Sequence, residues 1–565
     1  MKKLILLSSV ILALLLAGCS GEKKEPRIIE NKDGSISITR VDEDGKAIAY
    51  GKKVDGYSNV TIADLSQTSK NNPLSISLAN YSDKDIYIEF NCDMKVVDKE
   101  GGKTEIIWMI NEVDENFPQL YREYLNSDEW TKLEGSAYIH VGKNRQFYLS
   151  GAGMNKENLT VYLKNFRFTL QGDGIGKQKF EKKSWLEVPS LKEAYKDYFD
   201  YFGFATTYQN ELVLDEVQAG LKYQVDYITM GNEFKPDFIF NWTTPRKFTD
   251  FIGEDGKAYK VPADVPRFTR SDSCLRICKE NGLKMRGHTL LWHAQTPKWF
   301  FRSDWKVDGE LVSPEEMNAR LEWYIKTMME HNAQWEAENN NGEHIIKVWD
   351  VVNEACSDNV TETNWVRGKE TSDWTAIYGD GTYIVNAFRY ANKYAPADVE
   401  LVYNDYGCSS PRKRKGILKI IESIKAAPDA RIDAVGMQSH VGMDTIVTGP
   451  DSFEAAIQDF VNHGLNVQIT ELDIGHGDKP YSPVRMKIKY KDFFKVFIAN
   501  RKTADHKGVE GVSLWGLNDE GTWLNALQEY KGHTQKPLLF ETKEFIAKPA
   551  FYGVLEAAEA AETAD

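Results

Sequence analysis

The chain has 565 residues, of which 42% are hydrophobic and 27% charged, a globular composition long enough for two domains. The formal net charge of −14 argues against a nucleic-acid partner, because neutralising phosphates requires basic patches. We interpret the densest basic run, residues 412–415, as the start of a helix on a solvated face. The 14 Trp and 27 Tyr fit a carbohydrate-handling protein, but the core of any large protein would account for them equally well.

The amino terminus carries a pattern typical of export. Two lysines follow Met1, an apolar run covers 4–16, and the segment ends in Leu-Ala-Gly before Cys19. This run is shorter than the ~20 residues of a bilayer span. It resembles the signal peptides of bacterial lipoproteins, which implies cleavage after residue 18 and lipidation of Cys19. Residues 19–27 would then be a tether, and a lipid anchor would be the only membrane contact.

That resemblance places the exported protein at the outer membrane, on its periplasmic face or at the cell surface. An ordinary secretory signal with an incidental Cys19 is the alternative.

Residues 28–171 consist of short alternating strands broken by turn residues, which predicts an all-β sandwich. In the closing segment, 159–170, the alternation changes phase near Asn165, so we expect a bulge or a tight turn there. The closing sequence LTVYLKNFRFTL resembles the jelly-roll carbohydrate-binding modules attached to plant-wall hydrolases. A purely structural spacer domain is the alternative.

Residues 172–189, which are rich in glycine at their start, predict a linker. From 190 to 555, strand-like runs alternate with helical stretches, the pattern of βα units in a parallel sheet. We predict eight strands, at 202–207, 227–233, 284–292, 345–354, 399–407, 434–440, 466–474 and 511–519. Eight strands close a barrel, so the expected fold class is α/β: a (β/α)8 TIM barrel preceded by a smaller all-β sandwich and followed by a tail, 556–565.

Local signals support two of the helices. Ser313 followed by Pro314 and two glutamates predicts a capped helix start, and Ser452 predicts another, which Gly464 ends. Cys274 and Cys278 lie four residues apart in a helical stretch. We interpret them as structural thiols, because no second ligand pair lies nearby to complete a metal site.

Seven consecutive strands become densely polar at their carboxyl ends, which in a closed barrel face one basin. The motifs are ITMGNEFK, RGHTLLWHAQ, WDVVNEA, YNDYG, GMQSH, ITELDI and SLWGLND. They supply carboxylates, amides, imidazoles and tryptophans, without a Ser-His-Asp order, a phosphate loop or clustered metal ligands, so we expect neither metal nor cofactor. Glycosidic cleavage requires two opposed carboxylates, and Glu354 and Glu471 are the candidates.

In order and spacing, GHTLLWH, WDVVNEA, QSH, ITELDI and LWGLND are similar to the motifs of glycoside hydrolase family 10, the endo-β-1,4-xylanases. The resemblance covers about 190–555. It implies that Glu354 is the acid/base and Glu471 the nucleophile of a retaining double displacement, with carboxyls ~5–5.5 Å apart. For Glu354 to be protonated near neutral pH its pKa must be raised, which we attribute to the charge of Glu471.

The resemblance also implies a set of sugar contacts. Asn353 would hold the 2-hydroxyl of the reacting sugar, while His440 would bond the nucleophile and Asp473 would orient His440. The other expected contacts are Lys235, His288 and Gln438 as donors, Trp292, Trp515 and Trp523 as packing surfaces, and Asn232 and Gln295 as ligands of the next sugar outward. The implied partners are xylan and xylo-oligosaccharides.

The chain departs from the family pattern at one position. Gly231 stands where many members have glutamate before the asparagine, which puts affinity for longer oligosaccharides in doubt. Trp349 is predicted to lie in the core, and Tyr403 and Asn404 have no assignable role. An endo-glucanase, a mannanase or an inactive surface glycan-binding lipoprotein remain alternative functions, and the oligomeric state is open.

Overall fold

The structure is a computed structural model that describes ten strands between residues 27 and 171, and residues 182–562 except 450, 479 and 480. The predicted signal peptide and tether, with Cys19, lie outside the described residues apart from the last tether residue, Arg27.

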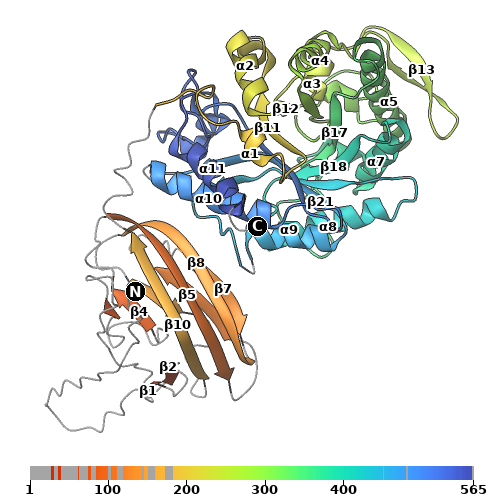
Figure 1. The fold of residues 1–565 in the computed structure, drawn as a ribbon. Helices are drawn as coiled ribbons and strands as arrows, with labels where there is room; N and C mark the ends of the chain where they lie inside the picture. Colours follow the sequence, from red (N-terminus) through yellow and green to blue (C-terminus); the bar gives the residue numbers. More distant parts are fainter. Residues whose placement is uncertain are drawn as a thin grey trace.

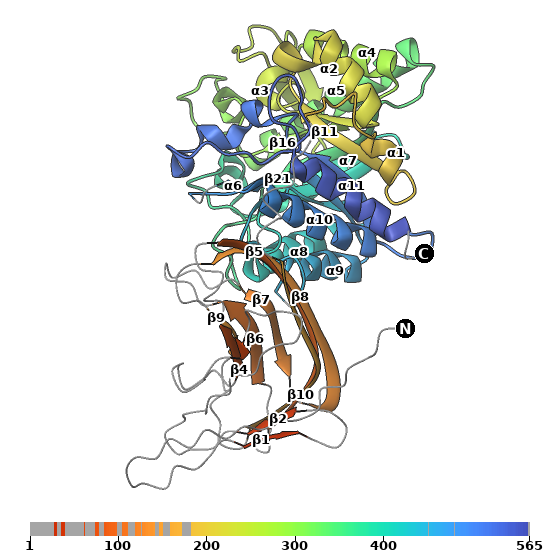
Figure 2. The same ribbon diagram turned by 60° about the vertical axis from the view of Figure 1, so that its left-hand side comes forward.

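The amino-terminal strands form two five-stranded antiparallel sheets, seen as two layers in Figure 2. The first has the order β1 (Arg27–Glu30), β2 (Ile36–Thr39), β10 (Leu159–Gln171), β5 (Lys84–Asp98), β8 (Ser127–Val141). The second has the order β3 (Thr61–Ile62), β4 (Leu74–Ser77), β9 (Gln146–Ser150), β6 (Thr104–Ile110), β7 (Gln119–Leu125). This is the layered all-β arrangement that the alternating strands predict.

The phase change near Asn165 is a bulge within one strand. β10 runs unbroken through this position, and its register against β5 shifts between Lys164 and Arg167. The bulge is therefore confirmed, and the alternative of a tight turn is wrong.

The second part of the chain is a closed barrel of eight parallel strands (Figure 1). They are β11 (Tyr201–Thr206), β12 (Tyr227–Met230), β15 (Lys284–Gly287) with β16 (Leu291–Trp292), β17 (Ile346–Asn353), β18 (Glu400–Asp405), β19 (Ala434–Met437) with β20 (His440–Gly442), β21 (Asn466–Gly475) and β22 (Val509–Leu514). The pairing of β22 with β11 and of β15 with β17 closes the ring. All eight predicted strands are confirmed, and so is the TIM barrel.

A helix follows each barrel strand and packs on its outer surface (Figure 1). In chain order these are α2 (Asp215–Gln224), α4 (Thr269–Asn281), α5 (Pro314–Asn339), α7 (Thr382–Tyr394), α8 (Pro411–Lys425), α9 (Phe453–Asn462), α10 (Pro483–Ala499) and α11 (Pro549–Glu562). Shorter elements are α1 (Leu191–Tyr195), α3 (Pro236–Ile239), α6 (Asp373–Tyr378), the hairpin β13 (Phe248–Ile252) and β14 (Ala258–Pro262), and the single turns Tyr208–Leu212, Lys298–Phe301, Asp519–Gly521, Trp523–Ala526 and Gln528–Tyr530. In the part of the chain that is described, no helix combines the length and apolarity needed to cross a bilayer.

The predicted helix caps are confirmed. The Ser313 hydroxyl accepts a hydrogen bond from the Glu316 N–H at 3.3 Å, and Ser452 accepts one from Ala455 at 3.1 Å. Gly464 has a φ of 75°, the left-handed conformation that ends a helix at little cost for glycine.

The structure differs from the predictions at three places. The end of the expected linker packs on the barrel, where Trp185 is 2% exposed and stacks on Phe545 at 3.8 Å between ring centroids. The expected tail continues α11 as far as Glu562. The basic run does begin α8, but Lys413 and Arg414 are buried, so the expectation of a solvated face is wrong for them. Acidic side chains contributed by other elements compensate both charges.

Candidate active site

The polar side chains predicted for the basin come together at the carboxyl ends of the barrel strands. Asn353 is the last residue of β17, His440 opens β20, and Glu471 and Asp473 lie in β21. Glu354 follows β17 directly, and Gln438 lies between β19 and β20. Parallel strands present these ends on one side of the barrel, so residues far apart in sequence share one site.

Two consecutive residues, Asn353 and Glu354, both contribute to the site. Successive side chains of a strand point to opposite faces, so an extended chain could not place both there. Glu354 instead has a φ of 57°, in the left-handed region. Gln438 Nε2 donates to Asn353 Oδ1 at 3.1 Å and to Glu354 Oε1 at 2.9 Å. A backbone conformation of this kind is costly for a residue with a side chain and is typical of functional positions.

Glu354 is partly buried, and both oxygens of its carboxyl accept hydrogen bonds. Trp292 Nε1 donates to its Oε2 at 2.9 Å, and Gln438 bonds the other oxygen. Burial raises the pKa of Glu354, and the negative charges of Asp405 and then Glu471 raise it further. Burial, and not the charge of Glu471 expected from the sequence, is the larger cause of the raised pKa.

Glu471 has the opposite environment. Burial opposes its ionisation, but hydrogen bonds from His440 and Asn404, together with the charges of His288 and His440, hold its pKa below the ordinary value. Asn404 Nδ2 donates to Glu471 Oε1 at 2.8 Å, and His440 Nε2 lies 3.2 Å from Glu471 Oε2. One glutamate is thus biased towards the acid and the other towards the carboxylate.

His440 bridges two carboxylates. Its Nδ1 lies 2.9 Å from Asp473 Oδ2, while its Nε2 faces Glu471. Burial disfavours its charged form, but Asp473 and then Glu471 overcome this and raise the pKa of His440 to about 10. Trp523 Nε1 also donates to Asp473 Oδ2, at 2.8 Å. The imidazole is therefore held as a cation, donating from both nitrogens.

A chain of side-chain amides joins the two glutamates. Asn353 Oδ1 accepts from Gln438 Nε2, which also bonds Glu354, and from Asn404 Nδ2 at 2.9 Å, which also bonds Glu471. Both bonds to Asn353 use its oxygen. The two carboxylates therefore belong to one site, and their predicted separation of ~5–5.5 Å stays a prediction.

A second group of predicted sugar contacts surrounds Lys235. Its Nζ donates to Gln295 Oε1 at 3.0 Å and lies 4.9 Å from the centroid of the Trp292 ring. Gln295 Nε2 in turn lies 3.5 Å from Asn232 Oδ1. Burial lowers the pKa of Lys235, against the attraction of Glu471 and Glu354. The four side chains form one connected edge of the site.

The His288 ring is oriented by the buried ion pair of Asp350 and Arg286. Its Nδ1 lies 2.9 Å from Asp350 Oδ2, and Arg286 contacts the same carboxylate at 2.9 and 2.5 Å. The His288 ring lies edge-on to Trp515, with centroids 5.4 Å apart. Trp349, predicted to be core, is 2% exposed, which confirms that prediction.

Sequence reasoning missed Asn404, Asp350 and Asp405 as members of the site. For Asp350 a signal existed, since an acidic residue within the apolar strand of WDVVNEA needs a buried partner. Asn404 and Asp405 come from YNDYG, where the polarity was visible but the partners were not. Within the described residues no cluster of three or more His, Cys, Asp or Glu is arranged to hold a metal ion.

Comparison with known sequences agrees with this geometry. The profile of Glycosyl hydrolase family 10 matches residues 190–557, the whole barrel. The chain belongs to glycosyl hydrolase family 10.

Proteins named as endo-1,4-beta-xylanases are similar to this chain. Endo-1,4-beta-xylanase Y of Acetivibrio thermocellus is 34% identical over 373 residues, 64% of this chain and 32% of that protein. A putative endo-1,4-beta-xylanase of Caldicellulosiruptor saccharolyticus is 34% identical over 315 residues, 54% of this chain and 94% of that protein. This chain spans only 32% to 38% of the length of the first three curated relatives.

One solved structure is similar along nearly the whole chain. It contains the CBM22-1 and GH10 modules of endo-1,4-beta-D-xylanase 10B of Clostridium thermocellum, complexed with xylohexaose. The match covers 94% of this chain and 96% of that one, with 27% sequence identity and a TM-score of 0.55.

Proposed function

We propose that this protein hydrolyses internal β-1,4-xylosidic linkages of xylan by a retaining double displacement. The observation that carries the proposal is the opposite bias of two glutamates in one site, with the pKa of Glu354 raised and that of Glu471 lowered. A retaining glycosidase needs this pair, one carboxyl as proton donor and one as nucleophile. Relatives named endo-1,4-beta-xylanase support the choice of xylan.

In the first step, Glu354 gives its proton to the glycosidic oxygen while Glu471 attacks the anomeric carbon. The glycosidic bond breaks, and a covalent glycosyl-enzyme forms on Glu471. Glu354, now a carboxylate, takes a proton from water, which displaces the sugar from Glu471. His440 and Asn404 are both hydrogen-bonded to Glu471. These bonds stabilise its carboxylate before attack and again when it leaves the anomeric carbon in the second step.

The Glu471→Ala variant tests this proposal. Turnover of xylan should be lost while xylo-oligosaccharide binding, measured by calorimetry, is largely kept. Glu362→Ala, which removes an exposed ion pair with Lys415 on the outer surface, serves as a control that should retain turnover. Retained turnover in Glu471→Ala would refute the assignment of the nucleophile.

The substrate class is tested by reducing-sugar release from xylan, carboxymethyl-cellulose and mannan. We expect xylan to be hydrolysed fastest. Faster release from either of the other polymers would assign the site to an endo-glucanase or a mannanase. No turnover of any polymer, combined with intact binding, would favour the glycan-binding alternative.

We further propose that the amino-terminal β-domain, residues 28–171, is a carbohydrate-binding module. Its two antiparallel sheets and the similarity of nearly the whole chain to a two-module xylanase structure support this. The test compares a Glu471→Ala full-length chain with a Glu471→Ala chain that begins at residue 182, for retention on insoluble xylan. Weaker retention of the shorter chain is expected, and equal retention would favour a spacer domain.

We also propose that the protein is an exported lipoprotein of the outer membrane, anchored through Cys19. The support is the sequence pattern of residues 1–19 alone. Cys19→Ala should move the protein from the membrane fraction to the soluble fraction and abolish incorporation of labelled fatty acid. Unchanged membrane association would contradict the anchor.

A further inference from the structure

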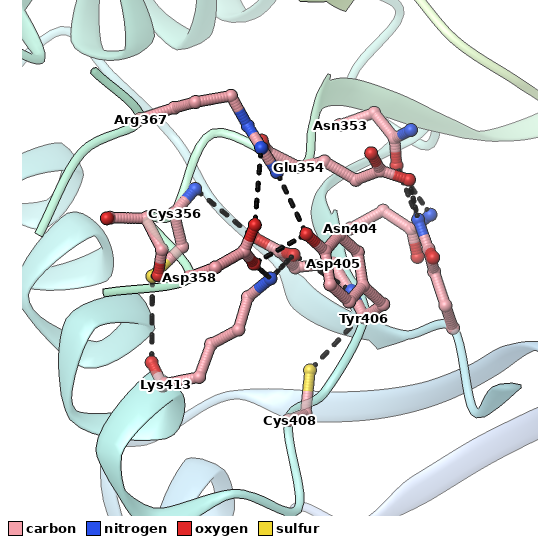
Figure 3. A network of polar contacts seen from close by, with 12 residues as sticks. Asn353, Glu354, Cys356, Asp358, Arg367, Asn404, Asp405, Tyr406, Cys408 and Lys413 are labelled. Atoms are coloured by element: carbon pink, nitrogen blue, oxygen red, sulfur yellow. Dashed lines mark hydrogen bonds and ion pairs between the residues drawn. The ribbon is translucent and has the colours of Figure 1, made fainter. Parts of the chain in front are cut away.

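A network of four charged side chains lies next to the Glu354 segment (Figure 3). It consists of Asp405 at the end of β18, Lys413 on α8, and Asp358 and Arg367 in the segment after β17, and is called the Asp405 network here. Lys413 Nζ lies 3.1 Å from Asp405 Oδ1 and 2.9 Å from Asp358 Oδ1. Arg367 Nη1 lies 3.4 Å from Asp358 Oδ2, which connects all four residues.

The hydrogen bonds around Asp405 favour its ionised form. Its Oδ1 receives Lys413 Nζ and the Tyr406 N–H at 2.9 Å, and its Oδ2 receives the Tyr403 hydroxyl at 2.6 Å and the Cys356 N–H at 3.2 Å. Four donors occupy the two oxygens, and a protonated carboxyl would have to reverse the Tyr403 bond or lose one of the other three. Asp405 is fully buried on the first strand beyond β17. Burial raises its pKa, and the charge of Lys413 together with the bonds from Tyr403 and the Cys356 N–H opposes that rise.

The same network holds the backbone on either side of Glu354. Arg367 Nε donates to the Glu354 carbonyl at 3.0 Å, and Asp405 and Tyr403 accept from the Cys356 N–H. The Glu354 N–H donates to the Asn404 carbonyl at 2.9 Å. These bonds determine the left-handed turn, with a φ of 57°, that brings the Glu354 carboxyl into the site next to Asn353.

From this geometry, and resting on the proposed function, we infer that Asp405 and Arg367 are positioning residues for the proton transfers of Glu354. Arg367 fixes the turn that aims the carboxyl, and Asp405 supplies a fixed negative charge that favours the protonated acid. The other charged groups facing Glu354 are Glu471 from β21 and Lys235 from the segment after β12. Facing Asp405, the groups are Lys413 from α8, Arg367, Tyr403, Tyr383 from α7, Cys356 and Cys408.

A substrate pair separates an effect on proton donation from a general loss of structure. The kcat/KM value reports bond cleavage, which needs Glu354 as an acid for a sugar leaving group but not for a 2,4-dinitrophenolate leaving group. General acid catalysis contributes about 10²–10⁴-fold in rate. For Asp405→Asn we expect kcat/KM on xylotetraose to fall at least about tenfold, with kcat/KM on the dinitrophenyl xylobioside nearly unchanged.

The pH profile gives a second readout. Bond cleavage requires protonated Glu354, so kcat/KM on xylotetraose declines as pH rises through the pKa of Glu354. Removing the charge of Asp405 lowers that pKa, and the alkaline limb of Asp405→Asn should move to lower pH. Glu362→Gln, which removes an exposed carboxylate paired with Lys415 on the same helix, is the matched control and should change neither readout.

Arg367→Gln is a second variant for the same test, to be used if Asp405→Asn does not fold. It removes the bond from Arg367 Nε to the Glu354 carbonyl. It should lose kcat/KM selectively on xylotetraose, and Arg367→Lys should restore part of it. An equal loss on both substrates, or no loss on either, would overturn the inference. A wild-type protein that cleaves the dinitrophenyl xylobioside but no xylo-oligosaccharide or xylan would instead overturn the proposed function.

Discussion

Asn404 donates a hydrogen bond of 2.8 Å from Nδ2 to Glu471 Oε1. Its Oδ1 accepts from the Thr470 hydroxyl at 2.7 Å, so the amide cannot rotate without losing both bonds. Asn404 is thereby a fixed donor to the proposed nucleophile, contributed by a strand two positions from β21 in the barrel.

Asn404→Ala should therefore lower kcat on xylan. The variant removes one hydrogen bond to a buried carboxylate, worth about 1.5–3 kcal/mol, or roughly 10- to 150-fold in rate. Steady-state kinetics on xylotetraose would measure the loss. Asn392→Ala, which removes a side chain of α7 bonded to Asp429 and Arg431, should leave kcat unchanged. Equal activity of wild type and Asn404→Ala would contradict a role for the Asn404 bond.

The kcat/KM of the wild-type protein should be bell-shaped in pH. Activity needs ionised Glu471, whose pKa is lowered, and protonated Glu354, whose pKa is raised. Activity is thus lost as pH falls through the lower pKa and as pH rises through the higher one. With a dinitrophenyl xylobioside, whose cleavage needs no acid, the wild-type kcat/KM should lack the alkaline limb. An alkaline limb that persists with this substrate would assign it to a group other than Glu354.

The charge of His440 should appear in the stability of the protein. Its folded-state pKa is raised to about 10, so its stabilising contribution is complete below the unfolded value of about 6.5 and is lost as pH rises through about 10. The difference in free energy of unfolding between wild type and His440→Gln should therefore shrink between pH 6.5 and 10. Urea unfolding at a series of pH values measures it, and a constant difference would show that His440 is neutral.

The space at Gly231 permits a test of the missing glutamate. A Cβ built at this position would lie 3.5 Å from the Thr206 carbonyl oxygen and 3.5 Å from Thr207 Cγ2, which is ordinary contact. Gly231→Glu should lower KM for xylohexaose by about two- to tenfold through one added hydrogen bond, of about 0.5–1.5 kcal/mol. Gly231→Ala should show no such gain, and KM for xylotriose should change less in either variant.

Breaking the ion pair of Arg286 and Asp350 inside the barrel should lower the free energy of unfolding substantially. The two side chains are 1% and 0% exposed. Arg286→Met leaves the Asp350 charge buried without its partner and should lower the free energy of unfolding by about 3–5 kcal/mol. Adding Asp350→Asn should recover part of that loss, as measured by urea denaturation. An Arg286→Met variant as stable as wild type would show that the pair contributes nothing to the free energy of unfolding.

The sequence by itself determined the order and type of the barrel elements and the residues at the strand ends. Strand-like runs, caps such as Ser313 and Ser452, and polar motifs after each strand are local signals, because each depends on neighbours a few residues away. The bulge in β10 was predictable for the same reason, because the change in alternation lies within twelve consecutive residues.

Tertiary structure alone decided the contacts between those strand ends. The roles of Asn404 and Asp405 depend on the pairing of β18 with β17, which their polarity alone does not reveal. The burial of Lys413 likewise depends on the packing of α8 against Asp405. The pKa of Glu354 likewise depends first on burial, which no spacing of residues reveals. Charges and amides act across a few ångströms whatever their separation in sequence, so the environment of a site is a property of the closed barrel.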